Sequence, residues 1–229
     1  MTSAPSADER TGPAGTGRRL RHRQLAALAA PPVLIASTYL VFQAGTGWFG
    51  PRWGYLGGFV FFWAVWCFGF SVWAIGPRGV ATVLRPTRPR LPRPAALWCV
   101  LLAVPVVGGF LTRLLPELPG ATITVLALAL VIAWLNATAE ELLWRGVYIR
   151  LFPGRPVAGW LYPAVLFALW HVSPASVRGS SIVLVSSAAV LGLLYGWIAQ
   201  QTGTIRYTIL AHALVNSMGL GFALLVLDG

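Results

Sequence analysis

The sequence predicts an all-α protein, a polytopic transmembrane bundle of about seven to eight membrane helices. Of its 229 residues, 57% are hydrophobic and only 10% are charged, whereas soluble domains are about 25% charged. Apolar stretches follow one another from residue 25 to the C-terminus, and many approach the roughly 20 residues that a helix needs to cross a bilayer. No intervening segment is long enough for a soluble domain.

The N-terminal region differs from the rest in composition. Residues 1–24 are rich in Gly, Ser, Pro and Arg and lack an apolar run, which predicts a disordered, basic cytoplasmic tail. Residues 25–42 then form an apolar segment that we interpret as an uncleaved first span. The pair Pro31-Pro32 is expected to kink or interrupt this helix, because proline removes a backbone donor and clashes with the preceding turn.

Six further apolar segments complete the predicted membrane domain. The fourth is longer than one span and ends in a polar, charged turn. The segments lie near residues 55–76, 95–115, 121–150, 157–177, 181–200 and 204–227.

The net charge of +11 comes from 17 basic residues, all of them arginine. Arginine-rich and arginine-poor loops alternate along the chain: the N-terminal tail, residues 78–93 and residues 145–155 are rich, whereas the loops with Arg52 and Arg113 are poor. Basic residues collect in cytoplasmic loops. The charge therefore predicts a cytoplasmic N-terminus and contact with membrane lipid, and no nucleic-acid partner.

Very few ionisable residues lie within the apolar segments. Glu140 and Glu141 are adjacent in the fourth segment, His171 lies in the fifth and His212 in the seventh. Charged groups are costly inside a bilayer and face the bundle interior or a wet cavity. These four residues are therefore candidates for function.

Helix geometry assigns different roles to the two glutamates. Neighbouring residues point about 100° apart on an α-helix, so Glu140 and Glu141 are not expected to face one point. Glu141 and Arg145 are four residues apart and can pair, which leaves Glu140 for chemistry. The alternative is a purely structural ion pair at the membrane edge.

The two histidines extend the candidate site. Phe167 precedes His171, and His212 precedes Asn216, by four residues each, so each pair shares one helix face. At about 1.5 Å per residue, Glu140, His171 and His212 lie roughly 15, 16 and 12 Å from the cytoplasmic ends of their helices. The three groups are thus expected at one depth. An interhelical hydrogen bond is the structural alternative for each histidine.

Two glycine features favour close packing near the C-terminus. Gly192-x-x-x-Gly196 allows a close helix contact, and Thr202-Gly203 predicts a helix stop and a turn. The sixth and seventh spans are therefore predicted to form a helical hairpin.

Taken together, these motifs resemble one known family. Glu140-Glu141-x-x-x-Arg145-Gly146, Phe167-x-x-x-His171 and His212-x-x-x-Asn216 are similar to the three motifs of the CAAX protease and bacteriocin-processing family (CPBP, or ABI), over about residues 121–220. The resemblance implies a multi-pass peptidase, expected in a bacterial plasma membrane, with its cavity open to the cytoplasm. Residues 25–120 are then expected to be scaffold, and residues 121–229 the catalytic core.

The resulting hypothesis is an intramembrane endopeptidase, similar to CAAX prenyl proteases, that cleaves a membrane-associated or bacteriocin-type peptide. Glu140 is the expected general base, and His171 helps to hold the water. His212 and Asn216 stabilise the oxyanion, while Glu141, Arg145 and Phe167 support the site.

Three alternatives remain at this point. Glu140, His171 and His212 could bind Zn²⁺, although the lack of an HExxH motif favours chemistry that requires no cofactor. A non-catalytic self-immunity or scaffold protein would keep the fold. A proton-coupled transporter is less favoured, because its polar residues would be strung across the bilayer.

Overall fold

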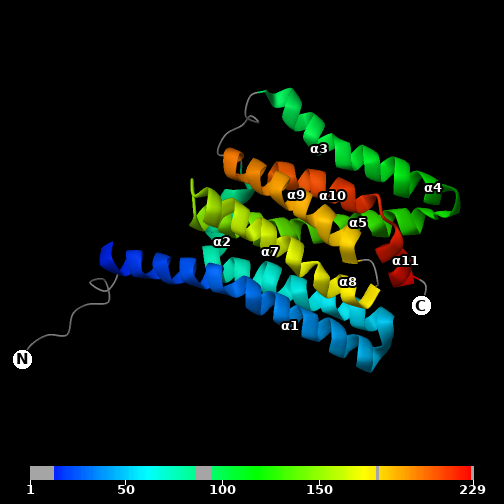
Figure 1. Ribbon diagram of the computed structural model, residues 1–229, viewed down its shortest axis with the longest axis horizontal. Coiled ribbons are helices and arrows are strands. Elements are labelled where there is room, and N and C mark those ends of the chain that lie inside the picture. The colour runs from blue at the N-terminus through cyan, green and yellow to red at the C-terminus, as the bar shows by residue number, and fades with distance from the viewer. Residues whose placement is uncertain (1–12, 86–93, 179–180, 228–229) are drawn as a thin grey trace, which may run out of the picture.

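The computed structural model describes residues 13–85, 94–178 and 181–227, and within these residues the chain is helical apart from short turns, without strands. Its long segments run back and forth as an antiparallel bundle (Figure 1). The elements are α1 (Pro13–Phe61), the π-helix η2 (Phe62–Phe70), α2 (Ser71–Leu84), α3 (Ala95–Gly109), the π-helix η3 (Phe110–Leu114), α4 (Leu115–Glu117), the 3₁₀ turn η4 (Leu118–Gly120), α5 (Ile123–Glu141), the π-helix η5 (Leu142–Gly146), α6 (Val147–Leu151), the π-helix η6 (Val157–Leu161), α7 (Tyr162–Trp170), α8 (Val172–Arg178), α9 (Ser181–Thr202), α10 (Arg206–Ser217) and α11 (Gly221–Leu227).

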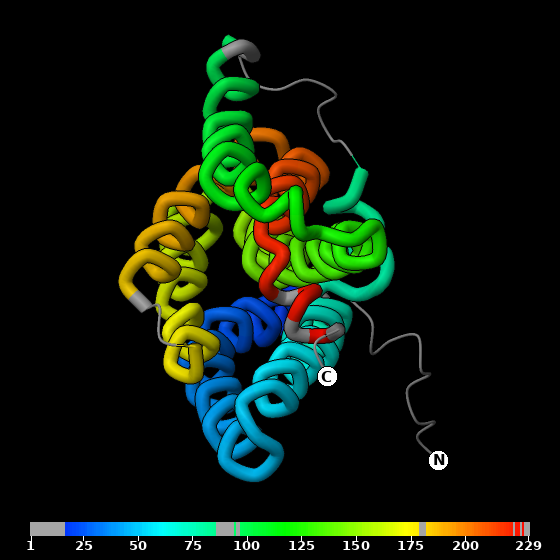
Figure 2. The backbone as a smooth tube through the Cα atoms, turned by 90° about the vertical axis from the view of Figure 1, so that its right-hand side faces the viewer, coloured from blue at the N-terminus to red at the C-terminus, as the bar shows by residue number. Residues whose placement is uncertain are grey.

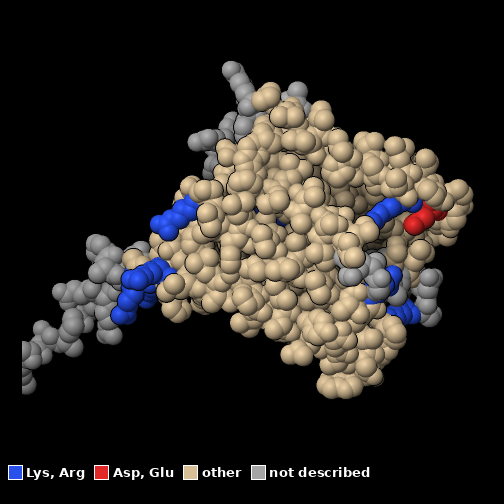
Figure 3. Space-filling model, in the orientation of Figure 1, with Lys and Arg blue, Asp and Glu red and all other residues tan. Residues whose placement is uncertain are grey.

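The predicted all-α fold is confirmed, and the chain is an integral membrane protein. Four stretches are long and apolar enough to cross a membrane, namely Gly17–Leu84, Leu97–Gly120, Ile123–Leu151 and Ile182–Thr202. Many large apolar side chains are exposed, as expected where lipid is the solvent. Charged side chains gather at the two ends of the bundle (Figure 3). The predicted count of seven to eight membrane helices is not confirmed.

The longest apolar stretch turns back on itself at a glycine. Gly50 has a φ of +80°, and Pro51 follows it. A residue before proline is disfavoured in the helical region, and glycine alone accepts this φ and ψ without strain. The second arm, from Pro51 through η2 to α2, therefore runs back beside the first (Figure 1). The same Gly-Pro arrangement occurs within α2, where Gly76 has a φ of +70° and precedes Pro77.

The expected interruption at Pro31-Pro32 is wrong. The helix passes through both prolines, and Gly50 is the non-helical position recorded inside α1. Because neither proline has an N–H, the carbonyls of Ala27 and Leu28 lose their helical donors. The hydroxyl of Tyr148 donates to the Ala27 carbonyl at 2.8 Å, and Tyr162 donates to Leu28. Two tyrosines thus replace the missing donors and attach α1 to α6 and α7.

The predicted disordered tail is corrected in part. Residues 1–12 lie outside the described residues, but the chain is helical from Pro13, so residues 13–24 belong to α1. One reason lies in a contact across the fold: Gln24 Nε2 donates to the Leu151 carbonyl at 2.7 Å. The proline-rich segment 86–93 also lies outside the described residues.

The helices that carry the motifs occupy the middle of the bundle. Seen along the bundle, the α1 hairpin lies at one edge and α3 at the other (Figure 2). Helix α5 packs on α10, and α9 packs on α7. A Cβ at Gly192 would lie 3.1 Å from Phe167 Cδ1, and one at Gly196 would lie 2.7 Å from Trp160 Cδ1. The predicted close contact therefore joins α9 to η6 and α7.

The predicted turn at Thr202-Gly203 is also confirmed. Helix α9 ends at Thr202, and Gly203 has a φ of +67°, the usual conformation after a helix end. Thr204 Oγ1 and the Ile205 N–H both bind the Val83 carbonyl, at 2.9 and 3.0 Å. The turn is thereby fixed against the end of α2, and α10 begins at Arg206 with a defined direction.

Candidate active site

Three structural elements deliver the predicted site residues to the bundle interior. Glu140 and Glu141 end α5, and Arg145 follows within the π-helix η5. Phe167 lies in α7, and His171 occupies the junction between α7 and α8. His212 and Asn216 lie on α10, which packs against α5. Single π-helical turns are frequent at functional sites, and η5 directly follows the two glutamates.

His212 lies between the two carboxylates. Its Nδ1 is 2.9 Å from Glu141 Oε1, and its Nε2 is 3.6 Å from Glu140 Oε2. A carboxylate oxygen accepts, so Nδ1 carries the hydrogen in the shorter contact. The expectation that Glu140 and Glu141 would not face one point is therefore wrong. The imidazole has a nitrogen on each side, and each glutamate approaches a different one.

The predicted ion pair of Glu141 with Arg145 is present. Arg145 Nη1 lies 2.9 Å from Glu141 Oε1, and the two side chains are 1% and 0% exposed. The guanidinium carbon lies 4.2 Å from the centre of the Phe167 ring, a favourable cation–π distance. Glu141 thus binds Arg145 and His212 together and fixes the first motif to α10.

Phe167 links the three motifs through its ring. Besides Arg145, the ring contacts His171 edge-on, with centroids 4.6 Å apart, and lies 6.3 Å from the His212 ring. His171 Nδ1 lies 2.8 Å from the Phe167 carbonyl. Because a carbonyl only accepts, Nδ1 is the protonated nitrogen. The Nε2 of a neutral His171 is then an acceptor.

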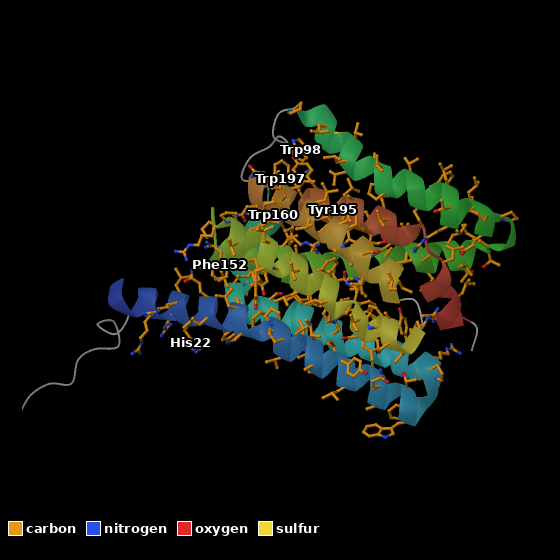
Figure 4. The ribbon with its side chains drawn as sticks, in the orientation of Figure 1. His22, Trp98, Phe152, Trp160, Tyr195 and Trp197 are labelled. Carbon is orange, nitrogen blue, oxygen red and sulfur yellow. The ribbon has the colours of Figure 1, made fainter. Side chains whose placement is uncertain are left out.

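Tyr195 of α9 completes the surroundings of His212. Its ring lies 5.7 Å from the His212 ring and 5.9 Å from the Arg145 guanidinium carbon, and Figure 4 shows the residue in the interior of the bundle. The side chain is fully buried. The charged cluster is therefore closed off by aromatic rings on the side of α9.

A cavity of about 810 Å³ adjoins this cluster. His171, His212 and Asn216 line it, as do Asn136 and Phe167. Glu140 is 2% exposed and is absent from the lining, so it lies just behind the wall that His212 and Asn136 form. The structure thus brings Glu140, Glu141, Arg145, Phe167 and His212 into one cluster, and places His171 and Asn216 on the cavity beside it.

Asn136 is a site residue that the sequence reasoning missed. Its side chain hydrogen-bonds the Glu140 carboxylate, while its Oδ1 accepts from Trp63 Nε1 at 2.8 Å. With Oδ1 engaged, the amide nitrogen is the group that donates to Glu140. Its spacing could have revealed it, because Asn136 is a polar residue in an apolar helix and lies four positions before Glu140, on the same helix face.

The zinc alternative stays a prediction. Among the described residues, no three His, Cys, Asp or Glu side chains come together as a group that could hold a metal ion. Glu140 and His212 are neighbours, and the contact of His171 Nδ1 with the Phe167 carbonyl leaves the Nε2 of His171 available as a ligand.

Comparison with known protein families gives a match. Residues 122–218 match the family described as type II CAAX prenyl endopeptidase Rce1-like. A search of curated proteins and a search of solved structures each gave no significant match. The matched segment begins just before α5, ends after α10, and contains every residue of the cluster and both cavity residues of the motifs. The predicted resemblance to the CAAX protease and bacteriocin-processing family is confirmed over this segment: residues 122–218, less than half of the chain, are similar to the Rce1-like type II CAAX prenyl endopeptidases.

Proposed function

We propose that this protein is an intramembrane endopeptidase in which Glu140 activates a water molecule to cleave a membrane-associated peptide. The family match over residues 122–218 supports a peptidase of the CAAX-protease type. One observation carries the assignment of the base. Glu140 Oε2 is buried without a hydrogen-bond partner among the described residues, 3.6 Å from His212 Nε2 and next to the cavity.

Each glutamate has one buried oxygen without a hydrogen-bond partner, and what distinguishes Glu140 is that its carboxylate forms no ion pair with Arg145. Glu141 Oε1 contacts both Arg145 and His212, so the negative charge of Glu141 is balanced within the protein. Asn136 holds the Glu140 carboxylate and leaves Oε2 to accept a proton. A general base must lie within reach of the proton that it removes, either directly or through one water. A water at the junction of Glu140, His212 and the cavity meets that condition.

His171 and Asn216 contribute from the cavity wall. The Nε2 of neutral His171 accepts a hydrogen bond and so orients the attacking water. The Asn216 amide can donate to the oxygen of the peptide carbonyl as it becomes negative. His212 Nε2 donates to the same oxygen when both ring nitrogens are protonated, since its Nδ1 hydrogen is committed to Glu141.

The reaction then balances with these groups alone. The water oxygen bonds to the carbonyl carbon, and one water proton passes to Glu140. The tetrahedral intermediate collapses, the C–N bond breaks, and the proton moves from Glu140 to the leaving amine. Glu140 ends as it began, and the products are a carboxylic acid and an amine.

Substrate trapping tests this proposal. The Glu140→Gln variant and the wild type are purified from cells, and the peptides that co-purify with each are identified by mass spectrometry. Gln is nearly isosteric but cannot accept the proton, so we expect peptides enriched on the variant that wild-type protein cuts at one bond. Glu117→Gln, at an exposed position, is the control and should cleave normally. Normal turnover by Glu140→Gln would contradict the assignment.

A further inference from the structure

Arginine is distributed unevenly between the two ends of the bundle. Most described arginines lie at the end where α1 begins, α2 and α6 finish, and α10 starts (Figures 1 and 3), here called the arginine-rich end. The acidic residues that the structure describes lie elsewhere: Glu117 is in α4 at the opposite end, and Glu140 and Glu141 are buried in the charged cluster. The tendency of arginine to collect on the cytoplasmic side explains the number of arginines, but it does not explain the pocket that lies among them.

This pocket, of about 650 Å³, is separate from the cavity beside His212, and the two share no lining residue. It is formed between the loop that joins α6 to η6 and the last turn of α9, close to the points where the spans Ile123–Leu151 and Ile182–Thr202 end. None of the described residues that line it is acidic. The pocket therefore lies at the level of the lipid headgroups.

Two tryptophans form walls of the pocket, and both are held in place. Trp160 lies on η6, and its Nε1 donates to the Leu193 carbonyl at 2.7 Å. Trp197 lies on α9, and its ring centre is 3.8 Å from that of Trp98 on α3. Figure 4 shows the three tryptophans one after another toward the arginine-rich end. Tryptophan is enriched where lipid headgroups meet acyl chains, so these walls suit a bound lipid.

Two glutamines supply the polar part of the lining. With its amide turned so that both ends pair, Gln200 Oε1 accepts from the N–H groups of Gly154 and Arg155 at 3.1 and 3.3 Å. This contact fastens the loop to the end of α9 and gives the pocket a defined shape. Gln201 is exposed and lines the pocket as well, and its amide nitrogen is a donor for a ligand oxygen.

Two exposed arginines flank the pocket. Arg155 stands between Gly154 and Pro156, which both line it, and Arg206 begins α10 three residues after Gly203, which lines it too. The ion pairs within the described part of the chain involve neither arginine. The Arg206 guanidinium carbon lies 5.4 Å from the ring centre of its neighbour Tyr207, which orients the group without neutralising it. The pocket is thus bordered by two positive charges that no described carboxylate balances.

The surface on the membrane side of the pocket is apolar. Leu161 follows Trp160 on η6, and Leu193 and Val190 lie one to two turns before Trp197 on α9. All three side chains are exposed, at 37%, 41% and 66%. A molecule with a charged head and apolar chains would therefore find complementary surface at both of its ends.

We propose that this pocket binds the headgroup of an anionic phospholipid, with Arg155 and Arg206 contacting the phosphate and the acyl chains lying on η6 and α9. Guanidinium groups bind phosphate through paired, charge-assisted hydrogen bonds, and basic pockets on the cytoplasmic side are suited to lipid headgroups. Thr202 and Gly203 line the pocket and lead into α10, so the bound lipid also stabilises the turn before the helix that carries His212. The proposal does not depend on the proposed function.

Lipid binding to the purified full chain tests this site. The protein in neutral detergent is titrated with dioleoylphosphatidylglycerol or dioleoylphosphatidylcholine, and the first bound lipid is quantified by native mass spectrometry. Since the acyl chains are identical, the ratio of the two Kd values reports the headgroup. We expect phosphatidylglycerol to bind about tenfold more tightly. It should also raise the midpoint of thermal unfolding, because a ligand that binds the folded state stabilises it.

Variants with equal loss of charge separate a local site from a generally positive surface. Arg155→Gln with Arg206→Gln should reduce the preference for phosphatidylglycerol to less than about twofold and abolish the rise in the unfolding midpoint. Arg19→Gln with Arg21→Gln removes the same charge from exposed positions of α1 at the same end, away from the pocket lining, and should retain both effects. Gln201→Leu keeps the volume of the side chain and should weaken phosphatidylglycerol binding severalfold.

Three results would overturn the proposal. The first is equal affinity of the wild type for the two lipids. The second is an equal loss of preference in the two double variants, which would assign the binding to diffuse surface charge. The third is displacement of phosphatidylglycerol by inorganic phosphate at a similar concentration, which would make the pocket a site for a free anion.

Discussion

His212 depends on two carboxylates that act differently. Glu141 is engaged by Arg145 and by His212 Nδ1, both at 2.9 Å, whereas Glu140 forms no ion pair with arginine and lies 3.6 Å from His212 Nε2. The pairing of Glu141 with Arg145 could be predicted from a spacing of four residues. The contact of both glutamates with His212 could not, because it depends on how closely α5 and α10 pack and on the two-sided shape of the imidazole.

This difference predicts opposite effects of two similar substitutions. Glu141→Gln leaves the buried Arg145 charge unpaired, so we expect a loss of roughly 3–5 kcal/mol in stability. Glu140→Gln removes no ion pair with arginine and keeps an acceptor for Asn136, so the midpoint of thermal unfolding should change little while cleavage is abolished. Thermal unfolding of the two purified variants in detergent, beside a cleavage assay, checks both. Equal destabilisation by the two would refute the division of roles.

A second residue-scale prediction concerns Trp63, whose Nε1 donates to Asn136 Oδ1 at 2.8 Å. Trp63→Phe removes this donor, and Asn136 can then rotate its amide and release Glu140. We expect cleavage to fall by at least about tenfold, as a misplaced catalytic group would cause. Trp66→Phe is the matched control, since it lies in the same π-helix and loses a hydrogen bond to Ser37 instead. A similar effect of both variants would point to general damage to η2.

At the scale of elements, local sequence patterns predicted the helices and several of their ends. They failed where a side chain distant in the sequence supplies a hydrogen bond. The apolar runs and the Thr202-Gly203 stop predicted α5, α9 and the turn after α9. Pro31-Pro32 was expected to interrupt α1, because proline lacks the backbone N–H that a helix needs. Tyr148 and Tyr162 lie more than a hundred residues away and supply the missing donors, so no local pattern could reveal that the helix continues.

The packing of α9 on α7 gives a prediction at this scale. A methyl group at Gly192 would lie 3.1 Å from Phe167 Cδ1 and 3.2 Å from the Ala164 carbonyl oxygen. Gly192→Ala should therefore displace the ring that contacts Arg145 and His171, and cost about 1–3 kcal/mol in stability together with activity. Gly108→Ala is the control, because its Cβ would meet nothing within 4 Å and should slightly stabilise α3. Full activity of Gly192→Ala would show that Phe167 need not be held in place.

At the scale of the whole molecule, the charge pattern and the cavity bear on the same question. The resemblance to the CAAX protease family implied a cavity open to the cytoplasm. In the structure the cavity extends from the histidines toward Arg113 and Arg178, away from the arginine-rich end. The charge pattern could be read from the sequence alone. The side on which the cavity opens could not, because it depends on how α3, α5, α8 and α9 pack in space.

The positive-inside rule then predicts that the cavity opens on the non-cytoplasmic face. Two positions on α9 test this: Ser187 lines the cavity, and Gln201 is exposed near the other end of the helix. Exposed Cys99 is first replaced by serine, while Cys67 is buried and can remain. A membrane-impermeant maleimide added to intact cells should label Ser187→Cys and spare Gln201→Cys, and inverted vesicles should give the reverse. If instead intact cells label Gln201→Cys alone, the arginine-rich end is outside, and the peptide enters from the cytoplasm as the family resemblance implied.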